Sequence, residues 1–261
     1  MASAPSRTMR RRLLIGLAVL AFAALASTAS GLKLRAGDII IYADGGFAPT
    51  RLPQFEDAPI TIHGGVRITT VSGELPPILE TIEVEFDRHG SVDTTGLPIC
   101  TEGQLEATTV EQARKKCAGA IVGSGSGSAI VKFEEQDPIP ASSPITIFNG
   151  PEKNGNPTVL AHAYLTNPIV TTFIVPVVIE KIHKGLYGYR TKATIPKIAN
   201  GAGIPIKGEL KVGKQWTYKG LRHSYVNARC ENGRLQARGQ VRFKDGTYLS
   251  GTFLRPCQVR R

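Results

Sequence analysis

The strongest constraint on the fold is a succession of short segments rich in β-branched and aromatic residues, separated by Gly, Pro, Asn and Asp. The segment 82–86 shows the pattern best, because Glu83 and Glu85 alternate with apolar residues, as in a strand with one face in water. Similar segments predict strands at 39–42, 60–62, 66–68, 129–133, 144–148, 159–165, 169–179, 189–195, 206–212, 222–230, 234–243 and 248–254.

Two details refine these strands. Pro176 lies inside 169–179 and cannot donate to a sheet ladder, which predicts an edge, a bulge or a strand that switches sheets. Asp245-Gly246 between the last two segments predicts a C-terminal β-hairpin. Many short strands with few helices favour an all-β fold, an antiparallel β-sandwich or jelly-roll-like structure.

A single helix is predicted. Thr108-Thr109-Val110-Glu111 has the form of a capping box, with Thr108 first and Glu111 three residues later. Basic residues follow in the last turn, where the helix dipole favours them, and Gly119 ends the helix. The segment 100–117, called here the helical clip, therefore forms a short helix between two cysteines.

The N-terminus predicts export. Four arginines precede an apolar run of 13 residues, Leu13–Leu25, and small residues follow it. This is the pattern of a signal peptide, and the run is shorter than the roughly 17–25 residues of a membrane-spanning helix. Cleavage is expected after Ala26 or Ala29. The interpretation is a signal peptide over 1–29 and a single all-β domain over 30–261, with a possible internal boundary near 199–203. No transmembrane segment is expected after cleavage.

Export makes disulfides the expected state of the four cysteines, Cys100, Cys117, Cys230 and Cys257. Three pairings are possible, and Cys100–Cys117 with Cys230–Cys257 is favoured because each joins neighbours within one local unit. The spacings contain no Cys-x-x-Cys pair and no adjacent histidine, so neither a zinc site nor a redox motif is predicted. No cofactor is expected.

Charge is divided unevenly. Residues 31–180 carry 10 Lys and Arg against 18 Asp and Glu, whereas residues 181–261 carry 18 Lys and Arg against 3 Asp and Glu. A basic C-terminal third suggests binding to a polyanion. The alternative is a solvated basic face, or one neutralised by the acidic part of the same molecule. In an exported protein an anionic cell-wall polymer or glycan is the expected partner, rather than nucleic acid. The oligomeric state is left open.

The candidate ligand-binding residues are Trp216, Tyr218, Lys214 and Lys219. The two aromatic residues would share one face of an extended segment, and aromatic faces stack on sugar rings. The alternative is that Trp216 packs in the core or covers a sheet edge.

Catalytic signals are weak. Gly123-Ser124-Gly125-Ser126-Gly127 lacks the remainder of a phosphate-binding loop, and a turn or flexible link between strands is the alternative. Glu83 and Glu85 could loosely serve as a carboxylate pair, but a solvent-facing acidic stripe is commoner. The five histidines form no metal-binding spacing, and no catalytic residue is assigned.

Several motifs resemble uncharacterised secreted β-rich proteins of actinobacteria that contain four cysteines and have no assigned activity. The resemblance covers roughly residues 36–258 and rests on Gly96-Leu97-Pro98-Ile99-Cys100, Gln112-Ala113, Cys117, Ala120, Val122-Gly123, Phe148-Asn149-Gly150, Ile195-Pro196-Lys197, Tyr225, Ala228-Arg229-Cys230, Asp245-Gly246-Thr247 and Arg255-Pro256-Cys257. It implies export and a disulfide-bonded β fold. The sequence thus predicts a non-catalytic binding or structural component of the cell envelope. The alternative is a secreted hydrolase acting on a glycan or ester.

Overall fold

The computed structural model describes residues 31–260, so the predicted signal peptide lies outside the described residues. The chain from Leu32 onward forms one compact unit. No helix in this described part has the length and apolar character needed to span a bilayer. The segment 199–203, the possible internal boundary, spans the end of a short 3₁₀ turn, η2 (Ile198–Gly201), and the start of a strand of the main sheet at Gly203.

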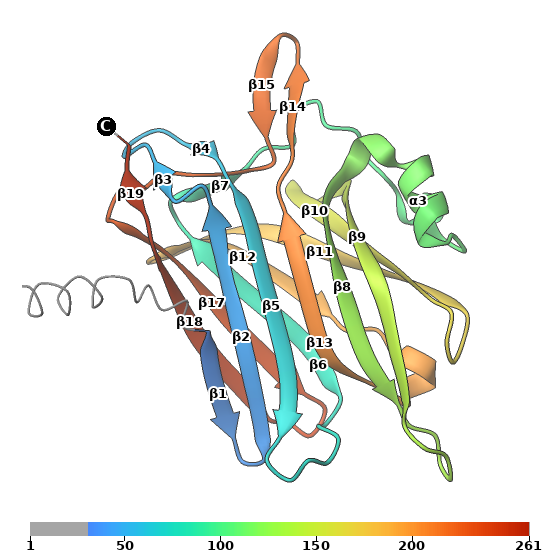
Figure 1. Ribbon diagram of the computed structural model, residues 1–261. Helices are drawn as coiled ribbons and strands as arrows, with labels where there is room; N and C mark the ends of the chain where they lie inside the picture. The colour runs from blue at the N-terminus through green and yellow to red at the C-terminus, as the bar shows by residue number, and fades with distance from the viewer. Residues whose placement is uncertain (1–30, 261) are drawn as a thin grey trace, which may run out of the picture. The chain divides into compact units, whose positions relative to one another are not determined.

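Twelve strands form one continuous sheet, and each strand pairs antiparallel with its neighbours (Figure 1). In spatial order they are β1 (Leu32–Ala36), β2 (Ile39–Ala48), β5 (Thr61–Thr70), β13 (Gly203–Val212), β8 (Ile121–Val131), β9 (Ile139–Lys153), β10 (Asn156–Leu165), β11 (Thr171–Lys184), β12 (Tyr187–Thr194), β6 (Leu79–Asp87), β17 (Arg234–Phe243) and β18 (Tyr248–Pro256). The sheet folds over on itself and is nearly closed, because β18 returns beside β1. The predicted all-β, antiparallel, sandwich-like fold is confirmed.

Strand β11 connects the two halves of the sandwich. Its first part, which includes Pro176, pairs with β10, and its second part pairs with β12 only from Ile179 onward. Pro176 therefore lies where β11 has a partner on one side only. Of the three predicted alternatives, the structure shows a strand with a free edge at Pro176, which changes its partner from β10 to β12 within one continuous sheet.

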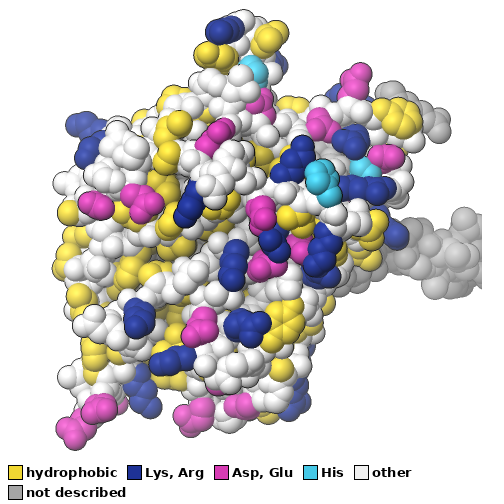
Figure 2. Space-filling model, turned by 180° about the vertical axis from the view of Figure 1, so that it is seen from behind, with side chains coloured by type: hydrophobic (Ala, Val, Ile, Leu, Met, Phe, Trp, Pro, Cys, Tyr) yellow, Lys and Arg dark blue, Asp and Glu magenta, His cyan; other side chains and the backbone are white. Residues whose placement is uncertain are grey.

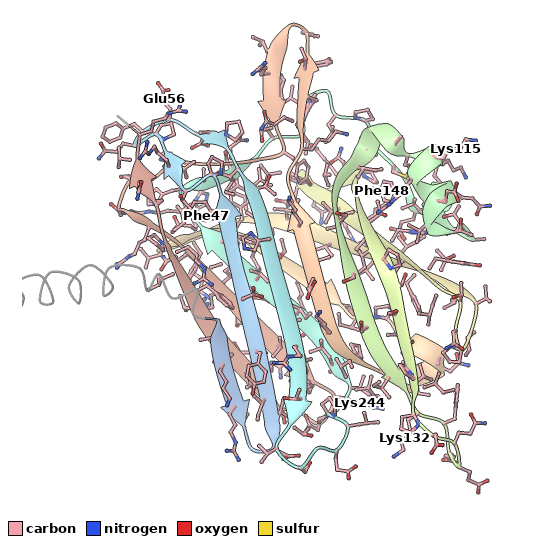
Figure 3. The ribbon with its side chains drawn as sticks, viewed as in Figure 1. Phe47, Glu56, Lys115, Lys132, Phe148 and Lys244 are labelled. Carbon is pink, nitrogen blue, oxygen red and sulfur yellow. A yellow bond between two sulfur atoms is a disulfide. The ribbon has the colours of Figure 1, made fainter. Side chains whose placement is uncertain are left out.

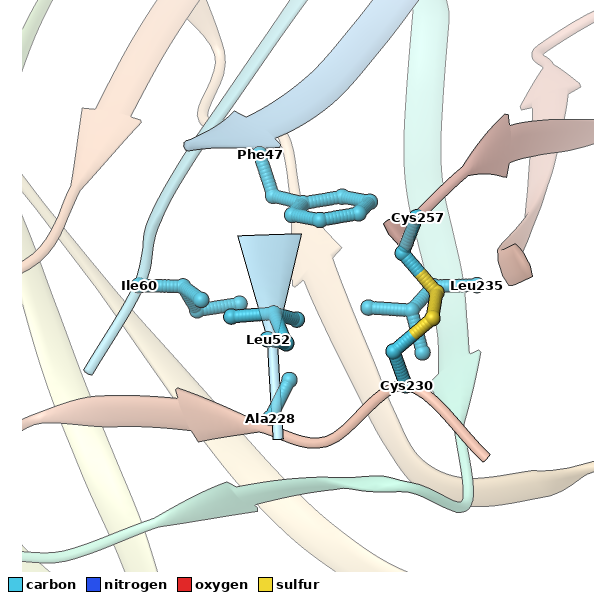
Figure 4. Packing of buried hydrophobic residues seen from close by; sticks show 7 residues of the cluster. All are labelled: Phe47, Leu52, Ile60, Ala228, Cys230, Leu235 and Cys257. Atoms are coloured by element: carbon cyan, nitrogen blue, oxygen red, sulfur yellow. A yellow bond between two sulfur atoms is a disulfide. The ribbon is translucent and has the colours of Figure 1, made fainter. Parts of the chain in front are cut away.

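A closing layer of short strands covers one end of the sandwich (Figure 1). It consists of β3 (Arg51–Leu52) with β19 (Gln258–Val259), and of β4 (Ala58–Pro59), β16 (Val226–Ala228) and β7 (Gly90–Val92). The disulfide Cys230–Cys257 lies beneath this layer, and Figure 4 shows it packed among Phe47, Leu52, Ile60, Ala228 and Leu235.

The helical clip packs on the outside of β9 and β10. It contains two short helices, α2 (Glu102–Leu105) and α3 (Val110–Lys116). The 3₁₀ turn η1 (Ala118–Ala120) follows directly after it. The predicted Cys100–Cys117 disulfide joins its ends, so both predicted pairings are confirmed. Phe148 of β9 lies under the clip and forms a second small core (Figure 3), together with Cys100, Leu105, Ala113, Cys117, Ala120 and Leu160.

The predicted helix start was wrong by one residue. The Thr109 hydroxyl, not that of Thr108, accepts the hydrogen bond from the backbone N–H of Gln112, and the backbone N–H of Thr109 donates to the side-chain oxygen of Gln112. Thr108 is instead buried and donates to the carbonyl of Leu105. The capping box therefore has Gln112, rather than a glutamate, at N3, the third residue of the helix.

The glycine-rich segment 123–127 is neither a loop nor a link, because it lies within strand β8. Gly123 and Gly125 are half-buried, whereas Ser124 and Ser126 are exposed. A Cβ atom on Gly125 would overlap the carbonyl oxygen of Glu209 in the neighbouring β13. The glycines thus allow a close approach of two strand backbones, and the segment does not form the loop on which a phosphate-binding motif depends.

Candidate functional site

The predicted ligand-binding aromatic residues lie on a β-hairpin that projects from the sandwich (Figure 1). The hairpin consists of β14 (Gln215–Tyr218) and β15 (Leu221–Ser224). Trp216 and Tyr218 share one face, as their spacing predicts, and His223 lies between them. The Trp216 and His223 rings stack with their centroids 5.5 Å apart, and the Tyr218 ring meets His223 edge-on at 6.2 Å. The Lys219 ammonium lies 5.4 Å from the centre of the Tyr218 ring.

This aromatic face is turned toward the loop before the helical clip. The Trp216 indole N–H donates to the carbonyl of Thr95 at 3.0 Å. The Tyr218 ring packs directly over Gly96, whose positive φ of 67° and lack of a side chain make room for it. Both aromatic side chains are therefore only partly exposed, and Trp216 also contacts the sandwich core. These contacts hold the hairpin in place and leave only part of each ring open to a ligand.

Lys214 lies apart from the aromatic face. Its ammonium donates to the carbonyl of Gly119, next to the clip, so it joins the base of the hairpin to that segment. Partial burial lowers the pKa of Lys214. Of the four predicted residues, the structure brings Trp216, Tyr218 and Lys219 together and places Lys214 in a structural contact.

A histidine–carboxylate pair lies at the hairpin. His223 Nδ1 is 2.7 Å from Asp93 Oδ2. Burial alone would raise the pKa of Asp93, but hydrogen bonds from Thr95 and His223 outweigh it and hold that pKa below its usual value. Among the described residues no hydroxyl group is hydrogen-bonded to His223, and the adjacent Ser224 donates to the carbonyl of Val226. The pair orients the imidazole for stacking, and no nucleophile is positioned for it.

A second histidine is held between two carboxylates. His89 is almost completely buried, with Nδ1 2.8 Å from Asp87 and Nε2 2.9 Å from Glu231.

His162 is also buried, and its Nε2 lies 3.1 Å from the Thr108 hydroxyl and 3.2 Å from the Thr108 carbonyl. Within residues 31–260 no group of three or more potential ligands is arranged to hold a metal ion.

The basic and acidic parts of the chain meet in several ion pairs. Carboxylates from residues 31–180 pair with basic groups from residues 181–261 in Glu180–Arg190, Glu85–Arg238, Glu85–Lys184, Asp57–Arg229 and Asp93–His223. Figure 2 shows Lys and Arg side chains interspersed with Asp and Glu on the rear face of the molecule. The expectation that the acidic part neutralises the basic part therefore holds for part of the basic surface.

Glu83 and Glu85 do not form a pair of catalytic carboxylates open to a substrate. Glu83 accepts a hydrogen bond from Gln240, and Glu85 is completely buried beneath Arg238. The prediction that both acids face water was wrong for Glu85. The neighbouring strand β17 supplies the arginine that covers it, and the period-two pattern of β6 alone contains no information about that neighbour.

A polar groove of about 460 Å³ lies on the outer face of β11 and β12, next to the turn between β9 and β10. Its lining consists of Lys153, Asn154, Asn156, Pro176, Val178, Glu180, Arg190, Lys192 and Thr194. The groove was not predicted from the sequence, because its residues come from four separate strands, β9, β10, β11 and β12. The one available signal was the alternation of Arg190, Lys192 and Thr194, which places their side chains on one face of a strand.

No protein-family model, curated protein or solved structure matches the chain. The resemblance to secreted actinobacterial proteins therefore stays a prediction. The fold and the site define a disulfide-bonded β-sandwich with an aromatic hairpin at one end and a cationic groove on an outer face.

Proposed function

We propose that this protein is exported and acts in the cell envelope as a non-catalytic binding or structural protein that contacts an anionic polymer. Two disulfides and no free cysteine among the described residues support an oxidising location, since thiols stay reduced in the cytosol. The apolar and basic pattern of residues 1–29 supports export.

The observation that carries the proposal is the cationic surface that remains after the internal ion pairs. Lys211, Lys219 and Arg222 are exposed at or near the hairpin, and no described carboxylate lies within 4.0 Å of their charged groups. Lys153 and Lys192 are likewise unpaired in the groove. Cations without ion-pair partners attract a polyanion, and the affinity for the polyanion falls once salt screens the charges.

The hydrolase alternative has less support from the geometry. Neither histidine–carboxylate pair, His223–Asp93 or His89–Asp87, lines the groove. The carboxylate in the groove, Glu180, is held by Arg190 through Oε2. A hydrolytic site needs titratable groups that converge on one cavity, and the only carboxylate among the residues that line the groove is Glu180, one oxygen of which is held by Arg190.

The test is sedimentation of the mature protein with isolated cell walls at low and high salt. We expect binding at about 50 mM salt that is largely lost at about 500 mM, where the Debye length falls well below 10 Å. The variant Lys219→Gln/Arg222→Gln should bind more weakly. The matched control Lys132→Gln/Lys244→Gln removes the same charge at the opposite end of the molecule (Figure 3) and should bind as the wild type does. Absent binding, or binding indifferent to salt, would contradict the proposal.

A further inference from the structure

We propose that the groove on β11 and β12 binds a segment of an acidic polysaccharide, that is, a chain of sugars carrying carboxylate groups. This inference rests on the proposed function and names the site and the ligand class within it. It places the specific contact on the outer face of the sandwich rather than on the aromatic hairpin, whose rings are largely occupied by contacts with Thr95 and Gly96.

The shape of the groove suits an extended chain. Pro176, Val178 and Glu180 alternate along β11, and Arg190, Lys192 and Thr194 alternate along β12, so both sets lie on the outer face. Side chains two residues apart on a strand are about 6.5–7 Å apart, which presents polar groups in a row. Pro176 and Val178 supply an apolar floor between these polar groups, as is usual in ligand sites.

One wall of the groove is fixed before a ligand arrives. Asn156 accepts a hydrogen bond from the backbone N–H of Lys181 at 3.2 Å and donates to the carbonyl of Asn154 at 3.2 Å. These bonds hold the β9–β10 turn against β11. Lys153 and Asn154 are therefore presented by an ordered turn, which reduces the entropy lost on binding.

The charges in the groove select an anion. Arg190 donates to Glu180 Oε2 through Nε at 3.0 Å and through Nη2 at 2.6 Å, and this pair is internally neutral. Lys153 and Lys192 have no described carboxylate within 4.0 Å, so neither ammonium group is engaged in an ion pair, although Glu83 lies opposite Lys192 on β6. An anionic group on the ligand would lie between these two ammonium groups.

The remaining polar atoms select hydroxyl groups on the same ligand. Glu180 Oε1 is not hydrogen-bonded to any described residue, and a carboxylate oxygen can only accept. A bare polyphosphate has no donor to offer it and would be repelled. A sugar hydroxyl can donate to Oε1 and accept from Asn154 or Thr194. Negative charge combined with hydroxyl donors describes an acidic saccharide.

The experiment is isothermal titration of the mature protein with a polygalacturonate oligosaccharide, with its neutral reduced counterpart, with poly-glutamate and with inorganic polyphosphate. We expect the acidic oligosaccharide to bind and the neutral one to bind at least about tenfold more weakly, since two ionic contacts are lost. The variant Lys153→Gln/Lys192→Gln should lose about tenfold in affinity. The control Lys132→Gln/Lys244→Gln, with the same loss of charge, should change by less than about twofold.

A second variant tests the role of the hydroxyl groups. Glu180→Leu removes both acceptor oxygens and raises the net charge of the groove, so it should tighten the binding of any ligand recognised by charge alone. If Glu180 accepts from sugar hydroxyls, affinity for the acidic oligosaccharide stays level or falls. Tighter saccharide binding by Glu180→Leu, or tighter binding of poly-glutamate or polyphosphate than of the oligosaccharide to the wild type, would overturn the saccharide assignment.

The outcomes separate this inference from the proposed function. If the wild type binds cell walls with salt dependence but the Lys153→Gln/Lys192→Gln variant binds the oligosaccharide equally well, the groove is the wrong site and the proposed function stands. If the wild type binds neither cell walls nor the oligosaccharide, both proposals fail.

Discussion

Arg238 and Glu85 form an ion pair on the outer face of the sheet that removes the carboxylate of Glu85 from water completely. Arg238 Nε lies 2.6 Å from Glu85 Oε2, and the guanidinium also lies 4.9 Å from the centre of the Tyr187 ring. Lys184 is 3.8 Å from the other oxygen, Oε1. The carboxylate of Glu85 on β6 is thus buried beside Arg238 of β17, whose guanidinium also contacts Tyr187 of β12, and near Lys184 of β11, the strand beyond β12. The hydrogen bond to Glu85 raises the pKa of Arg238, so the arginine stays charged.

Replacement of Arg238 should therefore destabilise the fold. Arg238→Ala leaves Glu85 with Lys184 as the only described cation within 4.0 Å, and we expect a loss of roughly 2–4 kcal/mol in the free energy of unfolding. Arg242→Ala is the matched control, because Arg242 lies four residues further along β17 and stacks on the exposed Tyr248. It should cost about 1 kcal/mol or less. Urea unfolding measures both, and equal losses would contradict the special role of Glu85.

Features of this structure that depend on residues close together in the chain were predicted from the sequence, whereas features that depend on residues from distant strands were not. The period-two pattern around Ile82, the turn at Asp245-Gly246 and the pairing of Cys100 with Cys117 depend on residues close together in the chain, and all were predicted. The burial of Glu85, the strand character of Gly125 and the groove at Lys192 depend on residues from other strands. Strand register determines which side chains meet, and a single sequence does not contain the order of twelve strands.

The same limit applies to the candidate site. Trp216 and Tyr218 were predicted to share a face because alternation along a strand is local. Their contacts with Thr95 and Gly96 could not be predicted, because more than 100 residues separate the two segments. Lys214 illustrates this further: its partner, the carbonyl of Gly119, is a backbone atom that has no residue-type signal.

His162 should make the stability of the protein depend on pH. Burial lowers the pKa of His162 below its usual value of about 6.5, an effect that hydrogen bonding at Thr108 only partly offsets. As pH falls below 6.5, the unfolded chain takes up a proton that the folded chain does not, so the unfolded state gains stability. The contribution of His162 to folding is therefore fully present above pH 6.5. It decreases as pH falls below 6.5 and stops changing below the folded pKa.

The measurement is the urea midpoint at a series of pH values from 7.5 to about 5. His162→Gln retains an amide that can donate to the Thr108 carbonyl and has no titratable group, so it should flatten this part of the profile. His63→Gln, at an exposed position, is the control and should keep the wild-type slope. If His162→Gln retains that slope too, the pH dependence comes from another group.

A side chain at Gly125 should disrupt the contact between β8 and β13. The Cβ atom of Gly125→Ala would overlap the Glu209 carbonyl oxygen and lie 2.7 Å from Leu210 Cδ2. Because a strand backbone must move to relieve the overlap, we expect a loss of about 1–3 kcal/mol, as for other overpacked sites. Ser126→Ala changes the exposed neighbour and should stay within about 0.5 kcal/mol of the wild type. Thermal or urea unfolding compares the two, and a neutral Gly125→Ala would show that β13 yields without cost.

Removal of either disulfide should weaken the fold by a similar amount. The loop closed by Cys100–Cys117 has a sequence separation of 17, and that closed by Cys230–Cys257 has a separation of 27. The chain-entropy model gives about 3 and 3.5 kcal/mol for these loops at 25 °C. The double variants Cys100→Ala/Cys117→Ala and Cys230→Ala/Cys257→Ala should show these losses in urea unfolding, with the larger loss for the pair beneath the closing layer. Alkylation of the native protein followed by mass spectrometry should find no free thiol. Four alkylated cysteines would show that neither disulfide forms, which would contradict the two expected stability losses and the proposed export.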